Sequence, residues 1–402
     1  MSHIVVVGAG QAGQQICATL RNEGFEGRLT LIGAETHPPY QRPPLSKGYL
    51  LGEISRERLF LKPEAWYADH GIDLRLGAPA ENIDPDARTL RLGAEVISWD
   101  QLAIATGLAA RPLPPEAGGD LGGVFTVRTL ADVDRMEAPL KAARNVVVVG
   151  GGYIGLEAAA VGRKLGAEVT VVEAGPRILG RVASAETAAV MRDIHIEHGV
   201  TIREDARLDR LVGERQVSAA RLANGEELPA DVVIVGIGLI PQCSIAQAAG
   251  LKCDGGVIVD AYGRTSNPAI WAAGDCALFP FRGGLARLES VQNAIDMAQA
   301  VARNMLGAEK PYEPMPWFWS DQYDVKLQIA GLNTGYDRVV MRGAGKVPMS
   351  LWYFCGSELR AVDAVGDARA YMVGKRLIES GARVAPDEVA DPETDLKALL
   401  KR

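Results

Sequence analysis

Short runs of consecutive apolar residues are the most regular pattern in this chain. Ile4–Val7 and Val146–Val149 are β-branched and contain no polar position, which is typical of parallel strands covered on both faces. Each run is followed by glycines, then by a stretch with helical spacing of apolar residues, and then by a second apolar run. This order predicts two strand–helix–strand units and an α/β fold.

The two units are copies of one motif. The segment from His3 to Glu35 superposes on the segment from Asn145 to Ala174 with a shift of 142 residues. Both contain G-x-G-x-x-G, at Gly8, Gly10 and Gly13 and at Gly150, Gly152 and Gly155. In such a motif the first glycine permits a tight turn, the second lets the backbone approach a pyrophosphate, and the third lets helix and strand pack closely. The start of the following helix then offers free N–H groups to the phosphates.

An acidic residue closes each copy. Glu35 lies 22 residues beyond Gly13, and Glu173 lies 18 residues beyond Gly155, at a distance suited to an adenosine ribose. A glycine-rich turn in another kind of α/β sheet is the alternative for either copy alone. The strand, helix and acid present in both copies favour two dinucleotide sites.

The acid of the second copy bears on the choice of cofactor. A carboxylate at Glu173 repels a 2′-phosphate and therefore favours NADH over NADPH, although Arg177 and Arg181 follow closely in what is otherwise an exposed loop. Two dinucleotide sites in one chain suggest two cofactors, one of which reduces the other. FAD with NADH is the natural pair, because the cofactors carry the redox chemistry while the protein holds them.

Composition narrows the class of protein. The chain has 402 residues, 48% hydrophobic and 23% charged, which indicates a globular protein of two or three domains. The net charge of −7 argues against nucleic-acid binding through bulk charge. The uncharged stretch 232–251 is broken by glycines and a proline, so we expect no membrane helix. No targeting segment precedes the first strand, and we expect a cytoplasmic protein.

The side chains that commonly bind metals are scattered. The five cysteines show no zinc spacing and are typical of reduced thiols. His195 and His198 are expected on the surface at the end of a helix, with Gly199 as the residue that terminates it. Two histidines without further ligands make a poor metal site, and we expect no metal.

Beyond these patterns, the chain resembles the FAD-dependent NADH:ferredoxin reductases of the glutathione-reductase fold, in particular the putidaredoxin-reductase type. The resemblance covers nearly the whole chain. It rests on GAGQAG at 8–13, RPPLSK at 42–47, ATG at 105–107, RTLADV at 128–133, GGGYIGLEAA at 150–159, VGIGLIP at 235–241, NPAIWAAGDCA at 267–277, ESVQNA at 289–294 and PWFWSDQYD at 316–324.

The resemblance implies a fold and its division into domains. The fold is α/β, with two Rossmann-like dinucleotide-binding domains of the glutathione-reductase type and an α+β C-terminal domain. We expect a discontinuous FAD-binding domain at 1–107 and 240–310, and an NADH-binding domain at 108–239. We expect a C-terminal domain at 311–402 that covers the flavin and contributes to partner docking. Strand-like runs at 326–330 and 338–341 fit this last domain.

The resemblance also implies site residues. Those expected to bind FAD are Gly8, Gly10, Ala12, Gly13, Glu35, Arg42, Pro44, Lys47, Ala80, Ala105, Thr106, Gly107, Arg128, Asp275, Val291 and Trp319. Those expected to bind NADH are Gly150, Gly152, Tyr153, Ile154, Gly155, Glu157, Glu173, Gly236 and Gly238.

Lys47, Glu157 and Trp319 are the expected catalytic residues. Lys47 and Glu157 are hypothesised to form a pair that opens or reorganises as NADH enters, and Trp319 to line the exit side of the flavin. The alternatives are a proline-rich turn that leads into a helix near Leu45, with Ser46 and Lys47 simply exposed, and a tryptophan that serves the core or an interface.

The segment 40–50 contains no cysteine, whereas the glutathione-reductase relatives carry a redox disulfide just after the first unit. Electrons are therefore expected to leave the flavin singly for an external carrier. The expected carrier is an acidic two-iron two-sulfur ferredoxin that feeds a haem monooxygenase or a ring-hydroxylating oxygenase, since the chain has no four-cysteine cluster spacing of its own. An NADH:rubredoxin reductase, a flavoprotein of slow turnover like apoptosis-inducing factor, and a direct oxidase remain alternatives.

Overall fold

The computed structural model describes residues 2–401, which form two compact units. The first unit contains the chain up to Arg42, Ser55–Ala109 and Leu239–Pro314. The second contains Pro43–Ile54, Ala110–Gly238 and the chain from Met315 onward. The three expected domains stay a prediction, because these units group the chain by contact and not by the cofactor bound. No helix within residues 2–401 is long and apolar enough to cross a membrane.

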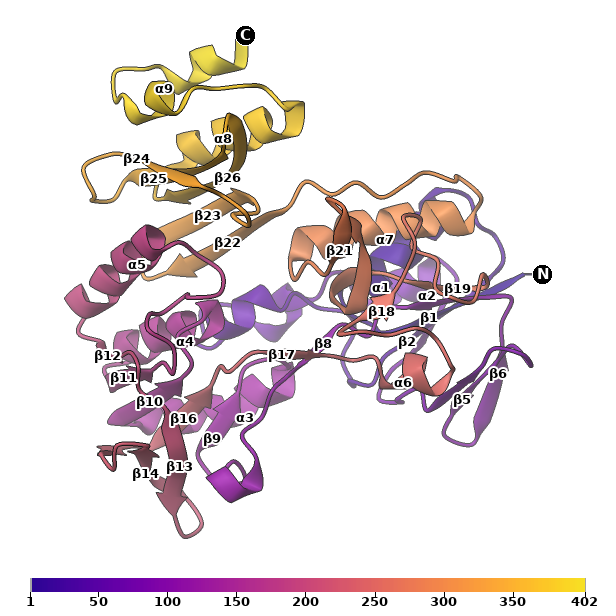
Figure 1. Cartoon of the computed structure of the whole chain (residues 1–402). Coiled ribbons are helices and arrows are strands. Elements are labelled where there is room, and N and C mark those ends of the chain that lie inside the picture. Colours follow the sequence, from indigo (N-terminus) through magenta and orange to yellow (C-terminus); the bar gives the residue numbers. More distant parts are fainter. Residues whose placement is uncertain (1, 402) are drawn as a thin grey trace. The chain divides into compact units, whose positions relative to one another are not determined.

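A five-stranded parallel sheet is the centre of the first unit (Figure 1). Its strand order is β19-β7-β1-β2-β3, with bounds Ile270–Ala272, Gln101–Ile104, His3–Val7, Arg28–Ile32 and Ile72–Arg75. Every residue of β1 is buried, as its unbroken apolar run predicts. Helix α1 (Gln11–Asn22) and helix α7 (Val291–Met305) pack against each other beside this sheet.

Shorter elements complete the first unit. Its other helices are α2 (Glu64–Asp69), α6 (Ser244–Ala248) and the 3-10 turns η2 (Arg56–Leu59) and η4 (Gly274–Cys276). Three small sheets comprise β4 (Asn82–Asp84), β5 (Thr89–Leu92) and β6 (Glu95–Ser98); β18 (Val257–Ile258), β20 (Ala277–Phe281) and β21 (Gly284–Ala286); and β17 (Leu239–Pro241) with β8 (Leu108–Ala110), whose last residue is counted in the second unit.

The second unit repeats the parallel sheet. Its order is β12-β11-β10-β16-β9, with bounds Thr201–Arg203, Glu168–Val172, Asn145–Val149, Val232–Val235 and Val124–Thr126. The helices of this part are α3 (Leu130–Ala142), α4 (Tyr153–Lys164) and α5 (Ala185–Glu197), with the 3-10 turns η1 (Pro43–Ser46) and η3 (Pro115–Ala117). A small sheet of β13 (Leu208–Gly213), β14 (Val217–Leu222) and β15 (Glu227–Pro229) completes it.

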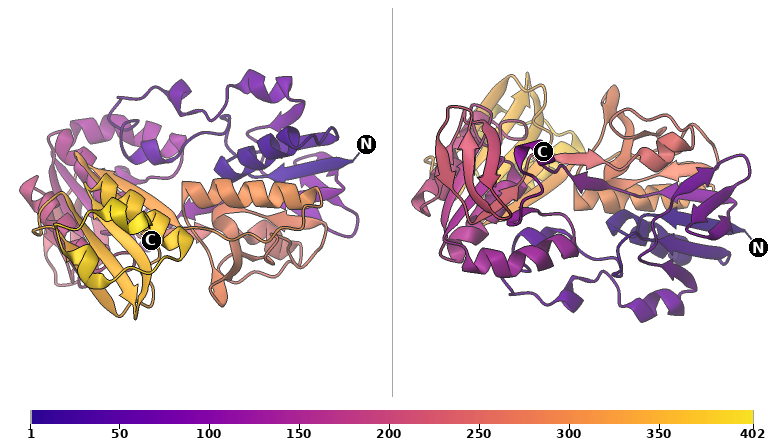
Figure 2. Two further views of the ribbon diagram at one scale, coloured as in Figure 1. Left: turned by 90° about the horizontal axis from the view of Figure 1, so that it is seen from above. Right: turned by 90° about the horizontal axis from the view of Figure 1, so that it is seen from below.

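The second unit also contains an antiparallel sheet, drawn in orange to yellow in Figure 2. Its order is β22-β23-β26-β25-β24, with bounds Trp317–Gln322, Val325–Gly331, Glu358–Val365, Met349–Cys355 and Arg338–Arg342. Helices α8 (Ala368–Ser380) and α9 (Pro386–Ala390) and the turn η5 (Leu396–Lys401) bury an apolar cluster with this sheet. Since α4 also packs against β22, the C-terminal strands belong to the same compact unit as the second glycine motif.

One expectation about burial is wrong. Helix α5 ends at Glu197 and Gly199 follows with φ +81°, as the sequence predicts. His195, however, is completely buried and does not lie on the surface. It faces β22, where the Gln322 amide contacts its Nε2 at 2.7 Å. The helical pattern shows that His195 and His198 share a face, but it cannot show that a distant sheet covers one of them.

Candidate functional site

The first glycine motif forms an open turn between β1 and α1. Gly8 has φ +117°, and an added Cβ there would lie 2.2 Å from the Ala105 carbonyl oxygen. An added Cβ at Gly13 would lie 1.8 Å from the Gly8 carbonyl oxygen. At Gly10, by contrast, it would meet nothing within 4 Å in the described part of the chain. The first and third glycines are therefore required by packing, whereas the second leaves room for a group to approach the backbone.

The start of α1 faces this same space. Its N-cap is Gly10, and no side chain among residues 2–401 caps it. The N–H groups of the first turn and the positive end of the helix dipole are therefore available to an anion. A pyrophosphate fits these features.

Other predicted FAD residues lie at the carboxyl ends of adjacent parallel strands. Residues 105–107 follow β7, the neighbour of β1, and the Thr106 hydroxyl donates to the Gln242 carbonyl at 2.6 Å. Asp275 lies in the η4 turn directly after β19, the neighbour of β7. Val291 is the first residue of α7, whose N-cap Ser290 accepts a hydrogen bond from the Asn293 N–H. The carboxyl edge of an α/β sheet is where ligands of such sheets bind.

The acid of the first motif holds an arginine. After β2, Glu35 accepts a hydrogen bond from the Arg42 guanidinium at 2.6 Å, and Arg42 also donates to the Tyr40 hydroxyl at 3.0 Å. The Tyr40 hydroxyl donates in turn to the second carboxylate oxygen of Glu35. The structure thus brings the predicted residues Glu35 and Arg42 together. Ala80 lies in the loop between β3 and β4, and the Gly77 N–H of this loop donates to the Glu35 carbonyl at 2.9 Å.

The second motif repeats this geometry between β10 and α4. An added Cβ at Gly150 would lie 2.4 Å from the Gly236 carbonyl oxygen, and one at Gly155 would lie 2.1 Å from the Gly150 carbonyl oxygen. At Gly152 it would meet nothing within 4 Å among the described residues. Gly238 follows Gly236 at the end of β16 with φ +108°. The predicted NADH glycines therefore form a second open turn.

Glu173, the acidic residue of the second motif, accepts hydrogen bonds from the backbone of its own loop. One carboxylate oxygen of Glu173 accepts from the Gly151 N–H at 2.8 Å, and the other accepts from the Gly175 N–H at 2.7 Å. Arg177, which could have received a 2′-phosphate, donates instead to loop carbonyls, including that of Ala183 at 2.9 Å. The Glu173 carboxylate is thus held in place near this turn. Arg177, the nearest arginine in sequence, donates to loop carbonyls and not to this carboxylate.

The residues that open α4 have different surroundings. The ring of Tyr153 lies 4.8 Å from that of Phe318, and its buried hydroxyl has no hydrogen-bond partner within the described chain. Burial raises the pKa of Tyr153 well above its usual value, so this residue stays neutral. Ile154 follows in the same turn.

Lys47 and Glu157 form an ion pair within the second unit. The Lys47 Nζ lies 2.7 Å from the Glu157 Oε2, and the two side chains are 20% and 5% exposed. The Ser46 hydroxyl donates to Oε2 at 2.5 Å and the Ser320 hydroxyl donates to Oε1 at 2.6 Å. Three donors therefore compensate for the burial of this carboxylate.

Ser46 and Ser320 were not predicted from the sequence. A serine carries no distinctive signal, and Ser320 lies 163 residues from Glu157 along the chain. Ser46 is buried, contrary to the alternative in which it was exposed. Beside the pair is a cavity of about 180 Å³, whose lining includes Lys47, Glu157 and Tyr323.

Trp319 lies in β22 among aromatic rings. Its ring centroid is 5.6 Å from that of Trp317 and 6.5 Å from that of Phe318. Trp319 is half-buried. Pro44, in η1, and Arg128, just before α3, belong with Trp319 to the second unit, whereas most predicted FAD residues belong to the first.

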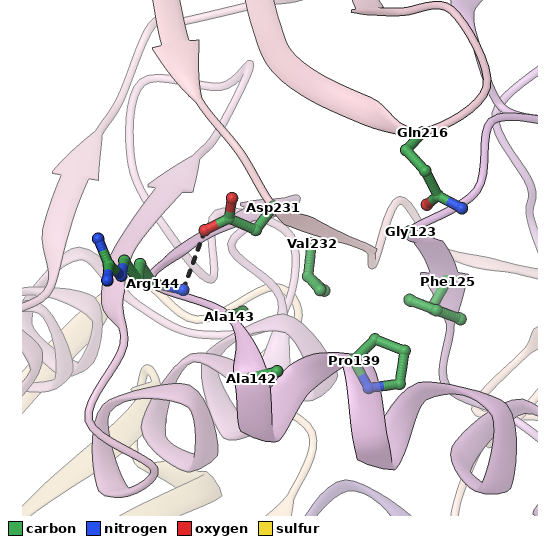
Figure 3. Close-up of a pocket in the computed structure, with 9 residues that line it drawn as sticks. All are labelled: Gly123, Phe125, Pro139, Ala142, Ala143, Arg144, Gln216, Asp231 and Val232. Carbon is green, nitrogen blue, oxygen red and sulfur yellow. Dashed lines mark hydrogen bonds between the residues drawn. The ribbon is translucent and has the colours of Figure 1, made fainter.

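A larger cavity of about 510 Å³ lies at the edge of the second unit's parallel sheet where β10 and β16 begin (Figure 3). It is lined by residues that include Pro139 of α3, Phe125 of β9 and Asp231, just before β16. Asp231 accepts from the Asn145 N–H at 2.8 Å, and backbone hydrogen bonds of this kind lower the pKa of its carboxyl. None of the predicted site residues lines this cavity.

The described residues offer little other chemistry. All five cysteines, at 17, 243, 253, 276 and 355, are free thiols. Across residues 2–401 no group of three or more histidine, cysteine, aspartate or glutamate side chains is arranged to hold a metal ion.

Comparisons with known proteins agree with this geometry. Residues 2–298 match the family described as pyridine nucleotide-disulphide oxidoreductase, and residues 317–400 match a reductase C-terminal domain. The chain is 40% identical to rhodocoxin reductase of Rhodococcus erythropolis, over 99% of this chain and 94% of that protein. It is 37% identical to putidaredoxin reductase of Pseudomonas putida, over 99% of this chain and 96% of that protein.

Solved structures show the same likeness. The reductase in the covalent putidaredoxin reductase–putidaredoxin complex is 37% identical, with a TM-score of 0.96 over 100% of this chain and 98% of that chain. The ferredoxin reductase for the CYP199A2 system from Rhodopseudomonas palustris is 39% identical, also with a TM-score of 0.96, over 99% of each chain. The predicted resemblance and fold class are thereby confirmed. The chain belongs to the pyridine nucleotide-disulphide oxidoreductase family and carries that family's fold together with a reductase C-terminal domain.

Proposed function

We propose that this chain is an FAD-dependent NADH:ferredoxin oxidoreductase. The observation that carries the proposal is the pair of open glycine turns, at Gly10 and Gly152, in one chain that has no redox thiol pair in segment 40–50. Two dinucleotides can then exchange a hydride, while thiols have no part in passing the electrons on. The names of the relatives support an electron-transfer role, since they include rhodocoxin reductase and putidaredoxin reductase.

FAD would bind the first unit. The residues proposed to bind FAD are Gly8, Gly10, Ala12, Gly13, Glu35, Arg42, Pro44, Lys47, Ala80, Ala105, Thr106, Gly107, Arg128, Asp275, Val291 and Trp319. The open first turn of α1 would take the pyrophosphate. When bound, FAD accepts two electrons as a hydride and releases them one at a time.

NADH would bind the second unit at Gly150, Gly152, Tyr153, Ile154, Gly155, Glu157, Glu173, Gly236 and Gly238. The Glu173 carboxylate retains lone pairs for a ribose hydroxyl although each of its oxygens already accepts an N–H. A 2′-phosphate would bring further negative charge to a carboxylate that is fixed in place, and this repulsion favours NADH over NADPH.

Lys47 and Glu157 would act at the reacting end. Lys47 supplies a positive charge, and Glu157 holds that charge in place while no nicotinamide is present. We propose that the pair opens or reorganises as NADH enters. Glu157 would then remain oriented by the hydroxyls of Ser46 and Ser320, which hold its two carboxylate oxygens separately.

The electron acceptor would be an acidic two-iron two-sulfur ferredoxin that serves a haem monooxygenase or a ring-hydroxylating oxygenase. Relatives named for both kinds of system support this, among them the reductase component of a biphenyl dioxygenase system, 37% identical over 99% of this chain. Trp319 would lie on the exit side for electrons. The five free thiols suit a reducing compartment, and we propose the cytoplasm.

The division of labour among domains is also a proposal. Residues 1–107 and 240–310 would form the FAD-binding domain, residues 108–239 the NADH-binding domain, and residues 311–402 the C-terminal domain. The two parallel sheets, each with a central strand that leads directly into a glycine motif, support the first two assignments.

The test is reduction of cytochrome c by the FAD-loaded protein with NADH, with and without an added two-iron two-sulfur ferredoxin. We expect rapid bleaching of the flavin by NADH under anaerobic conditions and cytochrome c reduction that depends on ferredoxin. Turnover with rubredoxin in place of ferredoxin would favour a rubredoxin reductase. Rapid oxygen consumption without a carrier, or slow turnover with a long-lived flavin–NAD⁺ complex, would contradict the proposal.

A further inference from the structure

A continuous chain of hydrogen bonds runs from Glu157 into helix α5. The Ser320 Oγ lies 2.6 Å from the Glu157 Oε1, and the Gln322 Nε2 lies 3.0 Å from the Ser320 Oγ. The Gln322 Oε1 lies 2.7 Å from the His195 Nε2, and the His195 Nδ1 lies 3.1 Å from the Tyr323 hydroxyl. Ser320, Gln322 and His195 are all 0% exposed. Figure 1 shows α5 beside the strand β22 that carries Ser320 and Gln322.

The chemistry of Glu157 determines which group is the donor in every hydrogen bond of this series. An ionised carboxylate only accepts hydrogen bonds, so the Ser320 hydroxyl must donate to it. The Gln322 amide then gives its NH₂ group to Ser320 and presents its oxygen to His195. The His195 Nε2 must therefore carry a proton, which leaves Nδ1 to accept from the Tyr323 hydroxyl.

The state of His195 agrees with this order. Burial lowers the pKa of His195 to about 4, so the ring is neutral at ordinary pH and carries a single N–H. The groups that face it are Gln322 and Tyr323 from the β22–β23 hairpin and His198 from its own helix; the Arg163 guanidinium of α4 acts on Tyr323. Every donor in the chain thus points towards Glu157, an arrangement in which successive hydrogen bonds strengthen one another.

We propose that Ser320, Gln322 and His195 are positioning residues for Glu157. They keep one donor directed at the carboxylate whether or not Lys47 stays paired with it, so that Glu157 holds its place when the Lys47–Glu157 pair reorganises. The inference rests on the proposed function, because only in that reaction does the position of Glu157 affect turnover. The direction of the hydrogen bonds does not depend on that function.

The backbone conformation of Tyr323 indicates that this residue, which begins the series of hydrogen bonds, has a positioning role. Tyr323 lies between β22 and β23 with φ +58°, a left-handed conformation that is unfavourable for a bulky side chain. Its ring stacks on His198 with a centroid separation of 3.6 Å, and its hydroxyl reaches His195. A glycine or asparagine would suit this turn better, so the side chain compensates for an unfavourable backbone.

Both ends of the chain of hydrogen bonds lie at one cavity. Tyr323 and Glu157 each line the cavity of about 180 Å³ beside Lys47. A cavity of this size and polarity can hold several water molecules. The polar groups between the two residues, from Ser320 to His195, are by contrast closed to solvent. Their orientation is therefore set by protein groups and not by exchangeable water.

The first test is the state of the His195 ring in the FAD-loaded protein. With ¹⁵N-labelled histidine, and with the His195 signal identified by its loss in His195→Gln, we expect a neutral ring protonated at Nε2 between about pH 5.5 and 8. A ring protonated at Nδ1, or a cationic ring at neutral pH, would overturn the proposed order of hydrogen bonds. This measurement needs neither NADH nor ferredoxin, and it can be made on the wild-type protein if a variant fails to fold.

The second test replaces the donor by an acceptor in the hydrogen bond between Gln322 and Ser320. Gln322→Glu preserves the shape but replaces the donor to Ser320 with an acceptor, so the Ser320 hydroxyl is drawn away from Glu157. We expect His195 to become cationic at neutral pH and the limiting rate of flavin reduction by NADH to fall on the order of 10-fold. We also expect a new ionisation in the pH profile of that rate. Gln216→Glu adds the same charge at an exposed position of the same unit and should change none of these readouts.

The outcomes separate this inference from the proposed function. If NADH fails to reduce the flavin of the wild-type protein, the proposed function is wrong, while the ¹⁵N spectrum still decides the order of hydrogen bonds. If Gln322→Glu makes His195 cationic but flavin reduction keeps its wild-type rate and pH profile, the positioning role is wrong although the reductase function stands.

Discussion

Replacing the buried Asp363 should change how the stability of the protein depends on pH. Asp363 is 0% exposed and lies on β26, where one of its oxygens accepts from the Thr187 hydroxyl of α5 at 2.8 Å and from the Tyr353 hydroxyl of β25. Its other oxygen has no partner within the described chain. Burial raises the pKa of Asp363 to about 6, although the hydrogen bonds from Tyr353 and Thr187 act to lower it.

The sign follows from the proton count. With a carboxyl pKa of 3.8 in the unfolded chain and about 6 in the folded protein, only the folded state binds this proton between those values. The stabilisation is complete below pH 3.8 and is lost as the pH rises through about 6. At 1.36 kcal/mol per pKa unit the full effect of Asp363 is about 3 kcal/mol, of which about 2.4 kcal/mol of folded-state stability is lost between pH 4 and pH 7. Asp363→Asn keeps the shape and cannot titrate.

Thermal unfolding of the FAD-loaded protein measures this difference. For a cooperative unit of the size of the second unit, about 2.4 kcal/mol corresponds to a shift in Tm of about 5 °C. The Tm of Asp363→Asn relative to wild type should therefore rise by about that amount between pH 4 and pH 7. Asp324→Asn, at an exposed position of the β22–β23 turn, is the control and should show no such trend. A difference between Asp363→Asn and wild type that is the same at both pH values would refute the reasoning.

Four further substitutions probe the proposed sites. Gly13→Ala forces a Cβ to 1.8 Å from a backbone oxygen and should destabilise the protein by about 3 kcal/mol in thermal unfolding, whereas Gly10→Ala should leave the fold intact and weaken FAD retention in gel filtration. Lys47→Ala should slow flavin reduction in stopped-flow on the order of 10-fold. Lys164→Ala, beside the same cavity, is the control and should not slow it. An unchanged rate in Lys47→Ala would contradict the role of Lys47. Trp319→Ala should lower ferredoxin-dependent turnover but not flavin reduction by NADH, and full turnover would exclude Trp319 from the exit side.

The sequence predicts the parts of this fold that repeat or have strict geometry. The β-branched runs at 4–7 and 146–149 are central parallel strands, and the glycines after them form the turns that their spacing indicates. Helix α7 begins directly after Ser290, whose hydroxyl caps it by accepting from the Asn293 N–H. These features are local, because a turn or a helix is decided by residues that are close in sequence.

The sequence could not show how distant residues surround the Lys47–Glu157 pair. Ser320 and Gln322 occupy ordinary polar positions of a strand, and only the packing of that strand on α4 and α5 buries them with His195. Histidine is intermediate in its tendency to be buried, and nothing near His195 in sequence marks it as buried. Burial by a distant element overrides local pattern, and for this reason the surface position expected for His195 was wrong.

The attachment of α5 at both of its ends bears on how this protein can be recombined with its relatives. Near its start, Ser184 and Thr187 bond to Tyr353 and Asp363, and near its end His195 bonds to Gln322. A chimera that exchanged only the residues from 315 onward would pair a foreign sheet with the native helix and keep these attachments only where that sheet carries matching partners. Crossovers that transfer residues 184–198 together with the C-terminal sheet should give functional hybrids far more often.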